Sequence, residues 1–449
     1  MKNVALHNLG CKVNSYELDV MQQSLSKNGY KIVPFDQAAD IYIVNTCTVT
    51  NIADRKSRQM LHRAKELNPE ALVVAVGCYV ETGKEALLRD AAVDLCIGNK
   101  DKARISEILR QHEKNPAVKG KEPQITSNFS NQVKLRELSE ILEKTGEHTR
   151  AYVKIEDGCN QFCSYCLIPY ARGRVKSRRR EEILSEIGGL IANGYKEIVL
   201  TGIHISSYGL DIYGDNKAYQ GESYLIDLIE DIGRLPELMR LRIGSLEPRI
   251  ITGDTAKRLS MVKCLCPHFH LSLQSGCNDT LKRMNRHYTA EEYAKSVETL
   301  RRYFEHPAIT TDVIVGFPGE TDREFSESRA FVDAMDFYET HIFKYSKRAG
   351  TAAERLPVQV PSPIKESRSR ELIGLSEAKA QAFREYYIGR TAEVLFEEKK
   401  LIDGKEYFVG HTPEYVMCGV SEVGILENEI RSVEIERILS RDTLLAKLR

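Results

Sequence analysis

The sequence predicts an α/β protein with three parts. We expect an N-terminal parallel α/β domain over residues 1–115, a central partial (β/α)6 TIM-like barrel over 145–375 and a small antiparallel β-barrel over 386–449. Through the first two parts, short apolar runs rich in β-branched residues alternate with polar, helix-like segments, which is typical of parallel sheets covered by helices. The C-terminal part loses this alternation and holds short strand-like runs separated by turn residues.

The N-terminal part begins with three strand candidates, VALHNLG, IYIVNT and LVVAVG, and VDLCIG continues the pattern. Polar helix-like segments, such as 14–28 and 53–67, follow them. This order favours one parallel sheet. From 111 to 149 the chain becomes polar and charged, which indicates a connector with one helical piece, LRELSEILEK.

The central part contains six strand candidates with helical stretches between most of them. They are AYVKI, EIVLTGI, RLRIGS, HFHLSL, TDVIVGF and HIFKYS. Six such repeats favour a partial barrel over a full eight-stranded one. A long helix is expected over 362–387, ended by Gly389. The strand candidates of the C-terminal part are TAEVLFEE, KEYFVGHT, EYVMCGV and RSVEIERIL.

Composition narrows the class of protein. The 449 residues carry 64 basic and 64 acidic side chains, so net charge neither indicates nor excludes nucleic acid binding. No apolar run is long enough for a membrane span, and the N-terminus lacks the pattern of a signal peptide. We therefore expect a cytoplasmic protein without a membrane partner. Eleven cysteines, an odd number, argue for metal or thiolate chemistry rather than a disulfide framework.

The densest cysteine cluster is the CxxxCxxC run of Cys159, Cys163 and Cys166. Three thiolates can hold a [4Fe–4S] cluster, which needs four ligands for saturation, so one iron stays open to bind a substrate. The alternative is a zinc site or buried thiols. Zinc usually takes four ligands in CxxC pairs, and no fourth ligand lies nearby in the sequence.

A second set, Cys11, Cys47 and Cys78, closes three predicted strands of the N-terminal part. The carboxyl ends of parallel strands meet at one sheet edge, so these cysteines are expected to converge as a second three-thiolate site. Buried strand-end cysteines are the alternative. The remaining cysteines are expected to be structural, because free cysteine buries readily; they are Cys96, Cys264, Cys266, Cys277 and Cys418.

The spacing in GCNQFCSYCLIPYARGR is the signature of the radical S-adenosylmethionine superfamily, which this motif closely resembles. The resemblance implies that the amine and carboxylate of S-adenosylmethionine bind the open iron. It also implies that one electron from the cluster yields a 5′-deoxyadenosyl radical. Tyr165, next to the last cysteine, would contact the adenine of the cosubstrate.

Taken together, the two cysteine sets and the terminal barrel resemble the methylthiotransferase family over essentially the whole chain. The matching motifs are NLGCKVNSYE, NTCTVT, VGCY, GCNQFCSYCLIPYARGRVKSR, TGIHISSYG, LRIGSLEP, LSLQSG, MNRHY, TDVIVGFPGE and YSKRAGT, and IGRTAEVLFE and GHTPEYV resemble the TRAM barrel. The sequences of the cysteine motifs are most similar to those of enzymes that act on N6-threonylcarbamoyladenosine at position 37 of tRNA. This resemblance implies two [4Fe–4S] clusters, two uses of S-adenosylmethionine, and replacement of adenine C2–H by a methylthio group.

Strand ends of the central barrel supply the candidate cosubstrate pocket. Active sites of such barrels lie at the carboxyl ends of the strands, although a polar residue there is as often structural. By position or by the resemblance, the candidates are Thr201, Gly202, Ser245, Glu247, Gln274, Val315, Gly316 and Phe317. Gly316 and Gly319 are also expected to permit close approach of the backbone.

Residues 172–180, RGRVKSRRR, hold six basic side chains and follow the cysteine loop directly. We interpret Arg172, Arg174, Lys176 and Arg178 as phosphate contacts, against the alternative of a solvated helix start. The family resemblance also assigns RNA binding to the terminal barrel, whose aromatic residues either stack on bases or form its core; they are Phe396, Tyr407, Phe408 and Tyr415.

The expected partners are a tRNA anticodon stem-loop, whose target base must leave its stack, and an electron donor such as flavodoxin or ferredoxin. The chain is expected to act as a monomer. Two alternatives remain open. One is a methylthiotransferase for isopentenyladenosine in tRNA or for a ribosomal-protein aspartate. The other is a non-catalytic iron–sulfur RNA-binding regulator, against which the intact CxxxCxxC and TDVIVGFPGE motifs weigh.

Overall fold

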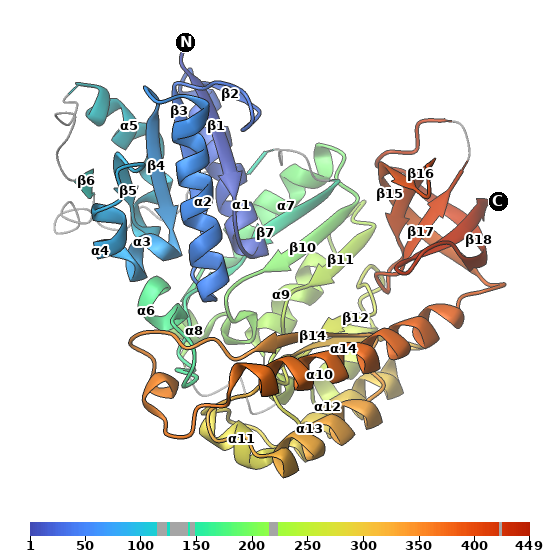
Figure 1. Cartoon of the computed structure of the whole chain (residues 1–449). Helices are drawn as coiled ribbons and strands as arrows, with labels where there is room; N and C mark the ends of the chain where they lie inside the picture. Colours follow the sequence, from blue (N-terminus) through green and yellow to red (C-terminus); the bar gives the residue numbers. More distant parts are fainter. Residues whose placement is uncertain (115–123, 126–141, 144–148, 215–222, 422–423) are drawn as a thin grey trace.

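The N-terminal part of the computed structural model is one parallel sheet with helices on both faces (Figure 1). The structure describes residues 1–449 except 115–123, 126–141, 144–148, 215–222 and 422–423. The strand order is β2-β1-β3-β4-β5-β6. The strands are β1 (Asn3–Asn8), β2 (Lys31–Val33), β3 (Ile41–Thr46), β4 (Leu72–Gly77), β5 (Leu95–Ile97) and β6 (Gln124–Ile125). The four predicted strands are confirmed as β1, β3, β4 and β5, whereas β2 and β6 were not anticipated.

Two apolar layers hold this sheet between its helices. Leu61 and Ala64 of α2 pack with Tyr42 and Val44 on one face, and Met21 and Leu25 of α1 pack with Ile41 on the other. The helices are α1 (Lys12–Lys27), α2 (Asn51–Leu67), α3 (Cys78–Thr82), α4 (Lys84–Leu88), η1 (Asn99–Arg104) and α5 (Ile105–Lys114). The predicted helical piece LRELSEILEK lies almost entirely outside the described residues.

The central part is an open half-barrel of six parallel strands in chain order. Two three-stranded sheets, β7-β10-β11 and β12-β13-β14, are joined by isolated parallel bridges from Leu241 to Leu265 and from Leu246 to Leu271. This arrangement confirms the six-stranded parallel barrel that the sequence predicts. The strands are β7 (Arg150–Lys154), β10 (Glu197–Thr201), β11 (Arg240–Ile243), β12 (His268–His270), β13 (Ala308–Val315) and β14 (Glu339–Lys344).

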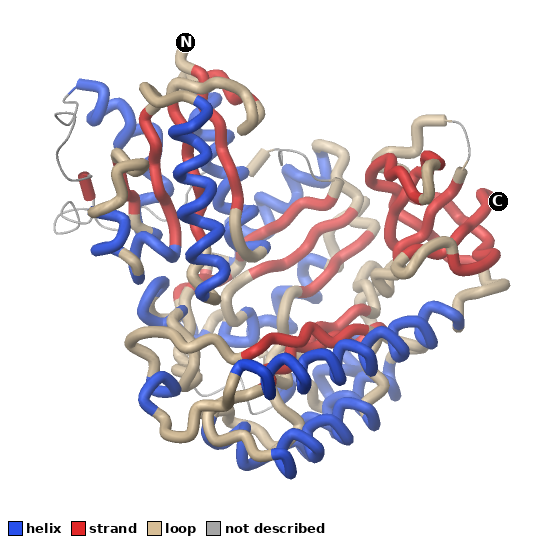
Figure 2. Tube along the Cα trace, in the orientation of Figure 1, coloured by secondary structure: helices blue, strands red, loops and turns tan. Residues whose placement is uncertain are grey.

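Helices cover the outer face of the half-barrel and bury one large apolar core against it. The long helix α14 (Ser362–Glu385) runs beside β14, as Figure 2 shows, and ends slightly earlier than expected. The other helices are α7 (Arg180–Ala192), α9 (Tyr224–Ile232), α10 (Gly253–Ser260), α11 (Asn278–Arg283), α12 (Ala290–Tyr303) and α13 (Asp322–Ala334). Short elements at the strand ends are β8 (Glu156–Asp157), α6 (Ile168–Arg172), β9 (Lys176–Ser177), η3 (Ile205–Ser207), α8 (Leu210–Tyr213), η4 (Pro248–Ile250) and η5 (Ala352–Arg355).

The C-terminal part is a closed five-stranded barrel in the order β15-β16-β17-β19-β18. Its strands are β15 (Thr391–Ile402), β16 (Lys405–His411), β17 (Met417–Val420), β18 (Ile430–Ile438) and β19 (Thr443–Leu448). The prediction of an antiparallel barrel is wrong for one pair, because β17 and β19 run parallel. None of the described helices is long and apolar enough to cross a membrane.

The turn after β16 docks against the amino ends of the half-barrel strands. Arg240 donates to the carbonyl oxygen of His411 at 2.8 Å, and Arg242 donates to that of Pro413 at 2.8 Å. The ring of Tyr415 stacks between His411 and His268. The C-terminal barrel therefore closes the end of the half-barrel at which the strands begin, and leaves the carboxyl ends to the cysteine loops.

Candidate active site

Cys11, Cys47 and Cys78 lie on three neighbouring loops at the carboxyl edge of the N-terminal sheet. Thr46 and Gly77 are paired across β3 and β4, so the cysteines that follow them are neighbours. Cys11 caps the start of α1, just after β1. At Gly10, with φ +125°, an added Cβ would lie 3.3 Å from the sulfur of Cys47, which shows how closely the first loop approaches the second. The predicted convergence in space is therefore present, and iron binding there stays a prediction.

The cysteine run 159–166 forms a compact loop beyond β7. The backbone N–H of Gln161 donates to the sulfur of Cys159, and that of Ile168 donates to the sulfur of Cys166, both at 3.4 Å. The guanidinium of Arg286 donates to the sulfur of Cys163 at 3.2 Å. N–H groups directed at sulfur stabilise thiolate ligands, and hydrogen bonds of this kind are typical around iron–sulfur clusters.

Burial makes these thiols difficult to ionise unless a cation is bound nearby. Burial raises the pKa of Cys47 to about 11, and it raises the pKa values of Cys159 and Cys166 to about 12. A buried thiolate without a cation is therefore unfavourable. Because an iron ion supplies the missing positive charge, these positions become thiolates when they bind metal. Both sets of residues thus suit a [4Fe–4S] cluster with three protein ligands.

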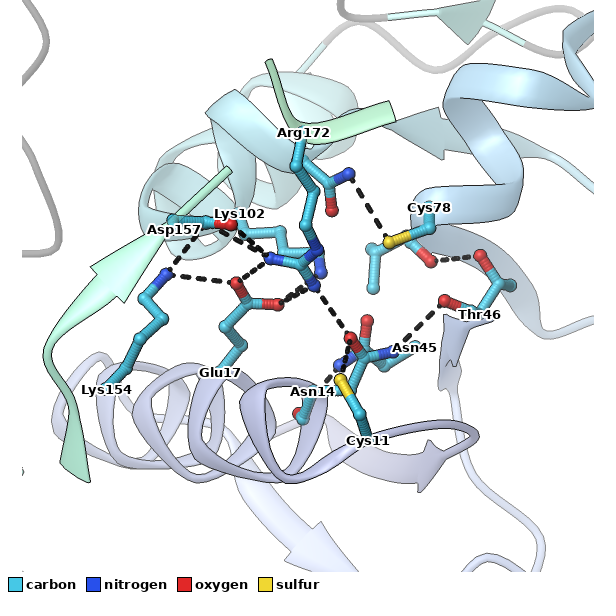
Figure 3. Close-up of polar contacts among 12 residues, drawn as sticks. Cys11, Asn14, Glu17, Asn45, Thr46, Cys78, Lys102, Lys154, Asp157 and Arg172 are labelled. Atoms are coloured by element: carbon cyan, nitrogen blue, oxygen red, sulfur yellow. Dashed lines mark hydrogen bonds and ion pairs between the residues drawn. The ribbon is translucent and has the colours of Figure 1, made fainter. Parts of the chain in front are cut away.

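A buried arginine joins chain segments from the two cysteine sites, and Figure 3 shows its contacts with Asn14, Glu17 and Asp157. Arg172, at the end of α6, donates to Glu17 at 2.8 Å, to Asp157 at 3.0 Å and to the side-chain oxygen of Asn14 at 2.8 Å. Glu17 and Asn14 belong to α1, which Cys11 caps, whereas Asp157 lies two positions before Cys159. One guanidinium therefore contacts the chain segments that carry both cysteine sets.

Asn14 extends this link to the second loop of the N-terminal set. Its side-chain N–H groups donate to the carbonyl oxygens of Leu9 at 2.8 Å and Thr46 at 3.2 Å, which flank Cys11 and Cys47. Asn99 completes the link, because its amide donates to the carbonyl oxygen of Ala171 at 2.9 Å and lies 3.7 Å from the sulfur of Cys78. The two cysteine sites consequently lie side by side.

The buried network around Arg172 carries a surplus of positive charge. Lys102 and Lys154 donate to Glu17 at 2.6 and 3.0 Å, so three cations face the carboxylates of Glu17 and Asp157. Arg172 and the two lysines hold the pKa of Glu17 well below its usual range, although burial opposes this. A cluster with three thiolates is anionic, so the surplus cation beside the cysteines favours its binding electrostatically.

The predicted cosubstrate residues lie at the carboxyl ends of the half-barrel strands, as expected. Thr201 and Gly202 end β10, Gln274 follows β12, and residues 315–317 end β13. Tyr165 packs edge-on against Phe317, with the ring centroids 6.3 Å apart. Contact of these residues with S-adenosylmethionine stays a prediction.

Three of the candidate strand-end residues have a different environment from the one anticipated. The carboxylate of Glu247 already pairs with Arg249 and His204, which lowers its pKa to about 2, whereas Ser245 is exposed. A Cβ on Gly316 would lie 2.3 Å from the Cγ of Lys365, so the packing of α14 already accounts for this glycine.

The structure corrects half of the predicted phosphate contacts. Arg172 and Arg178 are buried, and Arg178 pairs with Glu186 at 2.6 Å, so neither side chain can reach a phosphate. The basic run has a mixed role, because Arg172 ends α6 and Arg178 follows β9 with buried side chains, whereas the basic residues between them are exposed. Arg174 and Lys176 are exposed and remain candidates.

Sequence reasoning missed Glu156, Arg286 and the partners of Arg172. Glu17 and Arg286 lie within the motifs NLGCKVNSYE and MNRHY, which the family resemblance includes. The charged side chain in each motif was the signal that could have identified these two residues. Glu156 is fully buried beside Gly202, and one carboxylate oxygen accepts the N–H of His204 at 2.8 Å. Its other oxygen has no hydrogen-bond partner within the described part of the chain. Burial raises the pKa of Glu156 to about 8.

Two family models match the chain: Uncharacterized protein family UPF0004 over residues 3–98 and the Radical SAM superfamily over 153–332. The chain is 39% identical to the threonylcarbamoyladenosine tRNA methylthiotransferase MtaB of Bacillus subtilis, over 93% of this chain and 90% of that protein. It is 34% identical to the tRNA-2-methylthio-N(6)-dimethylallyladenosine synthase of Desulfitobacterium hafniense, over 88% and 86%. The structure of the radical S-adenosylmethionine methyltransferase TsrM of Kitasatospora setae matches with a TM-score of 0.54 at 18% identity, over 76% and 73%, and is similar in fold.

Replacing Arg172 by Met should destabilise the protein strongly. The variant removes the buried hydrogen bonds that Arg172 donates to Glu17, Asp157 and Asn14, and each hydrogen bond to a charged group contributes about 1.5–3 kcal/mol to the free energy of unfolding. Urea denaturation measures the change. Arg179→Met, at an exposed position of the same basic run, is the matched control and should change the value by less than about 0.5 kcal/mol. Equal stability of the two variants would contradict the linking role of Arg172.

Glu156→Gln should become more stable than the parent protein as pH rises. Because the folded pKa of Glu156 exceeds its unfolded value, the folded state binds more protons between the two values, and its stability falls as pH rises through 8. The parent should lose about 2 kcal/mol more than the variant between pH 6.5 and 9. Thermal unfolding at both pH values tests this, and parallel pH profiles would show that Glu156 ionises normally.

Proposed function

The chain belongs to the radical S-adenosylmethionine tRNA methylthiotransferases, and we propose that its substrate is N6-threonylcarbamoyladenosine at position 37 of tRNA. The product is the 2-methylthio derivative of that nucleoside. The observation that carries the proposal is the Arg172 link, which holds two three-cysteine loops side by side. The substrate follows from the 39% identical relative, whose name specifies threonylcarbamoyladenosine.

Two [4Fe–4S] clusters are proposed, one on each cysteine set. Cys159, Cys163 and Cys166 would hold the cluster that binds S-adenosylmethionine, and Cys11, Cys47 and Cys78 would hold the auxiliary cluster. When bound, the clusters and S-adenosylmethionine supply one-electron chemistry, which an aromatic C2–H requires because acid–base catalysis cannot break it at a useful rate.

The residues of the chain position these groups. Tyr165 and Phe317 form an apolar wall beside the cysteine loop, which suits the adenine of the cosubstrate. The backbone at Thr201 and Gly202 would bind its methionine amine, and Gln274 would contact it at the end of β12. Arg286 orients Cys163 through the hydrogen bond to its sulfur.

The C-terminal part is proposed to be a TRAM domain that binds the anticodon stem-loop. Phe396, Tyr407 and Phe408 are buried, which favours their core role over base stacking. Contacts with phosphate would then come from Arg174, Lys176 and the exposed Lys399 of the β15–β16 hairpin. We further propose three domains, over residues 1–115, 145–375 and 386–449. The enzyme would act as a monomer in the cytoplasm and would receive electrons from a flavodoxin or ferredoxin.

The second candidate substrate is isopentenyladenosine, because a relative with that type of activity in its name is 34% identical. Expression of the chain in a strain that lacks methylthiotransferases separates the two. Nucleoside analysis of its tRNA should reveal 2-methylthio-N6-threonylcarbamoyladenosine. Appearance of the isopentenyl product alone would overturn the substrate assignment, and absence of both products would favour a non-catalytic role.

Cys47→Ala should keep cleavage of S-adenosylmethionine and abolish methylthiolation. The substitution removes one ligand of the N-terminal cysteine set and leaves the loop of Cys159 intact. Formation of 5′-deoxyadenosine by the reduced protein and nucleoside analysis of tRNA measure the two activities. Cys96→Ala, at a buried cysteine within β5, is the matched control and should keep both. Loss of both activities in a folded Cys47→Ala protein would contradict separate roles for the two sites.

A further inference from the structure

The inner face of the half-barrel carries an unusual group of polar residues on β12, β13 and β14. In the parallel register His270 pairs with Thr310, and Asp312 pairs with His341. These side chains therefore share one face. Residues that alternate with them, such as Val313, pack into the apolar core under the outer helices.

Three of these side chains form a compact cluster. The Nε2 atom of His270 lies 3.4 Å from a carboxylate oxygen of Asp312, and the rings of His270 and His341 are stacked with centroids 5.9 Å apart. One donor or acceptor atom from each residue lies within 4.8 Å of the others. His270 and Asp312 are half-buried and His341 is exposed, so a ligand can reach the cluster from solvent.

The end of this face nearest the C-terminal part is buried and has a hydrogen-bonding atom without a partner among the described residues. His268 is 8% exposed, and its Nδ1 atom has no hydrogen-bond partner within the described ranges. Its ring stacks on Tyr415 of the C-terminal part, with centroids 5.2 Å apart. The group from His268 to His341 therefore runs from a buried end at β12 to an exposed end at β14, and we refer to it as the recess.

Lys12 adds a positive charge to this recess from the N-terminal part. Lys12 begins α1, which packs against β7 of the half-barrel. Burial lowers the pKa of His268, and the charges of Arg242, Lys12 and His270 lower it further. Nearby Arg242 pairs with Glu197 at 2.8 Å, and Arg150 pairs with Glu397 at 3.1 Å. Lys12 has no carboxylate within ion-pair distance in the described part of the chain. Its ammonium group, next to Cys11, is thus available to an anion.

We propose that this recess binds the N6 substituent of the target adenosine, with Lys12 receiving its carboxylate and His270, Asp312 and His341 receiving its hydroxyl and N–H groups. The inference rests on the proposed function, because a threonylcarbamoyl group is anionic and rich in hydrogen-bonding atoms. An isopentenyl group is apolar and would leave these polar side chains unpaired, which is costly in a partly buried site. The recess therefore determines specificity.

The position of Lys12 agrees with the reaction. Lys12 follows Cys11, a predicted ligand of the auxiliary cluster. A base whose substituent reaches Lys12 is held with its ring close to that cysteine set. Substrate selection and placement of the reacting carbon would thus depend on the same lysine.

The test compares two synthetic anticodon stem-loops that differ only in the adenosine, which is either N6-threonylcarbamoylated or unmodified. Binding to the reconstituted enzyme is measured by fluorescence anisotropy. The parent should prefer the modified RNA, and Lys12→Gln should reduce that preference about tenfold or more through loss of a charge-assisted contact. Lys12→Arg should keep most of it. Lys31→Gln, at an exposed position of β2, is the matched control and should keep the full preference.

His341→Phe is the second variant, because it lies outside the cysteine loops and should also reduce the preference. If Lys12→Gln loses iron, the RNA preference of the His341→Phe variant is the measurement that tests the proposal. Full preference in every iron-replete variant would overturn the recess as the binding site. A stoichiometric divalent metal that is bound by the parent and lost in His341→Phe would also overturn it, since a His–Asp–His group can hold such an ion. Absence of any preference in the parent would instead contradict the proposed substrate.

Discussion

The arrangement of the candidate active site depends on the buried guanidinium of Arg172. It joins α1 of the N-terminal sheet to the loop that begins the half-barrel, through Glu17, Asn14 and Asp157. Burial of these charges costs free energy unless each charge is paired. The pairing of Arg172 needs Glu17 from the N-terminal part and Asp157 from the half-barrel. The network therefore sets the relative position of two cysteine sites that come from different sheets. Its surplus positive charge also matches the anionic character of a thiolate-bound cluster.

The two ends of the half-barrel have separate roles. At the amino ends of the strands, the turn around Tyr415 fills the space and is held by Arg240 and Arg242. At the carboxyl ends, the cysteine loops and the predicted cosubstrate residues face one another across the strand ends. The inner face between them carries the histidines of the recess, and Lys12 belongs to α1 of the N-terminal part. The proposed substrate site would thus lie between the buried end at His268 and the two cysteine sets.

The sequence predicted most of the strands, although not, for example, β2, β6 or β19, and the position of both cysteine sets, because hydrophobic alternation and strand-end position are local features. It failed for Arg172 and Arg178, since a basic run does not show which side chains turn inward. The partner of Arg172 lies 155 positions away, and long-range pairing of this kind leaves no local pattern. The last strand, β19, was not among the predicted strands, so its parallel pairing with β17 was not anticipated either.

The central claim is that the chain holds two clusters side by side, one on each cysteine set. Iron and acid-labile sulfide content of the anaerobically reconstituted protein, together with EPR of its reduced form, tests this most directly. Two clusters predict about eight iron and eight sulfide atoms per chain, falling to about half in Cys47→Ala. About four of each in the parent protein, unchanged in Cys47→Ala, would contradict the claim.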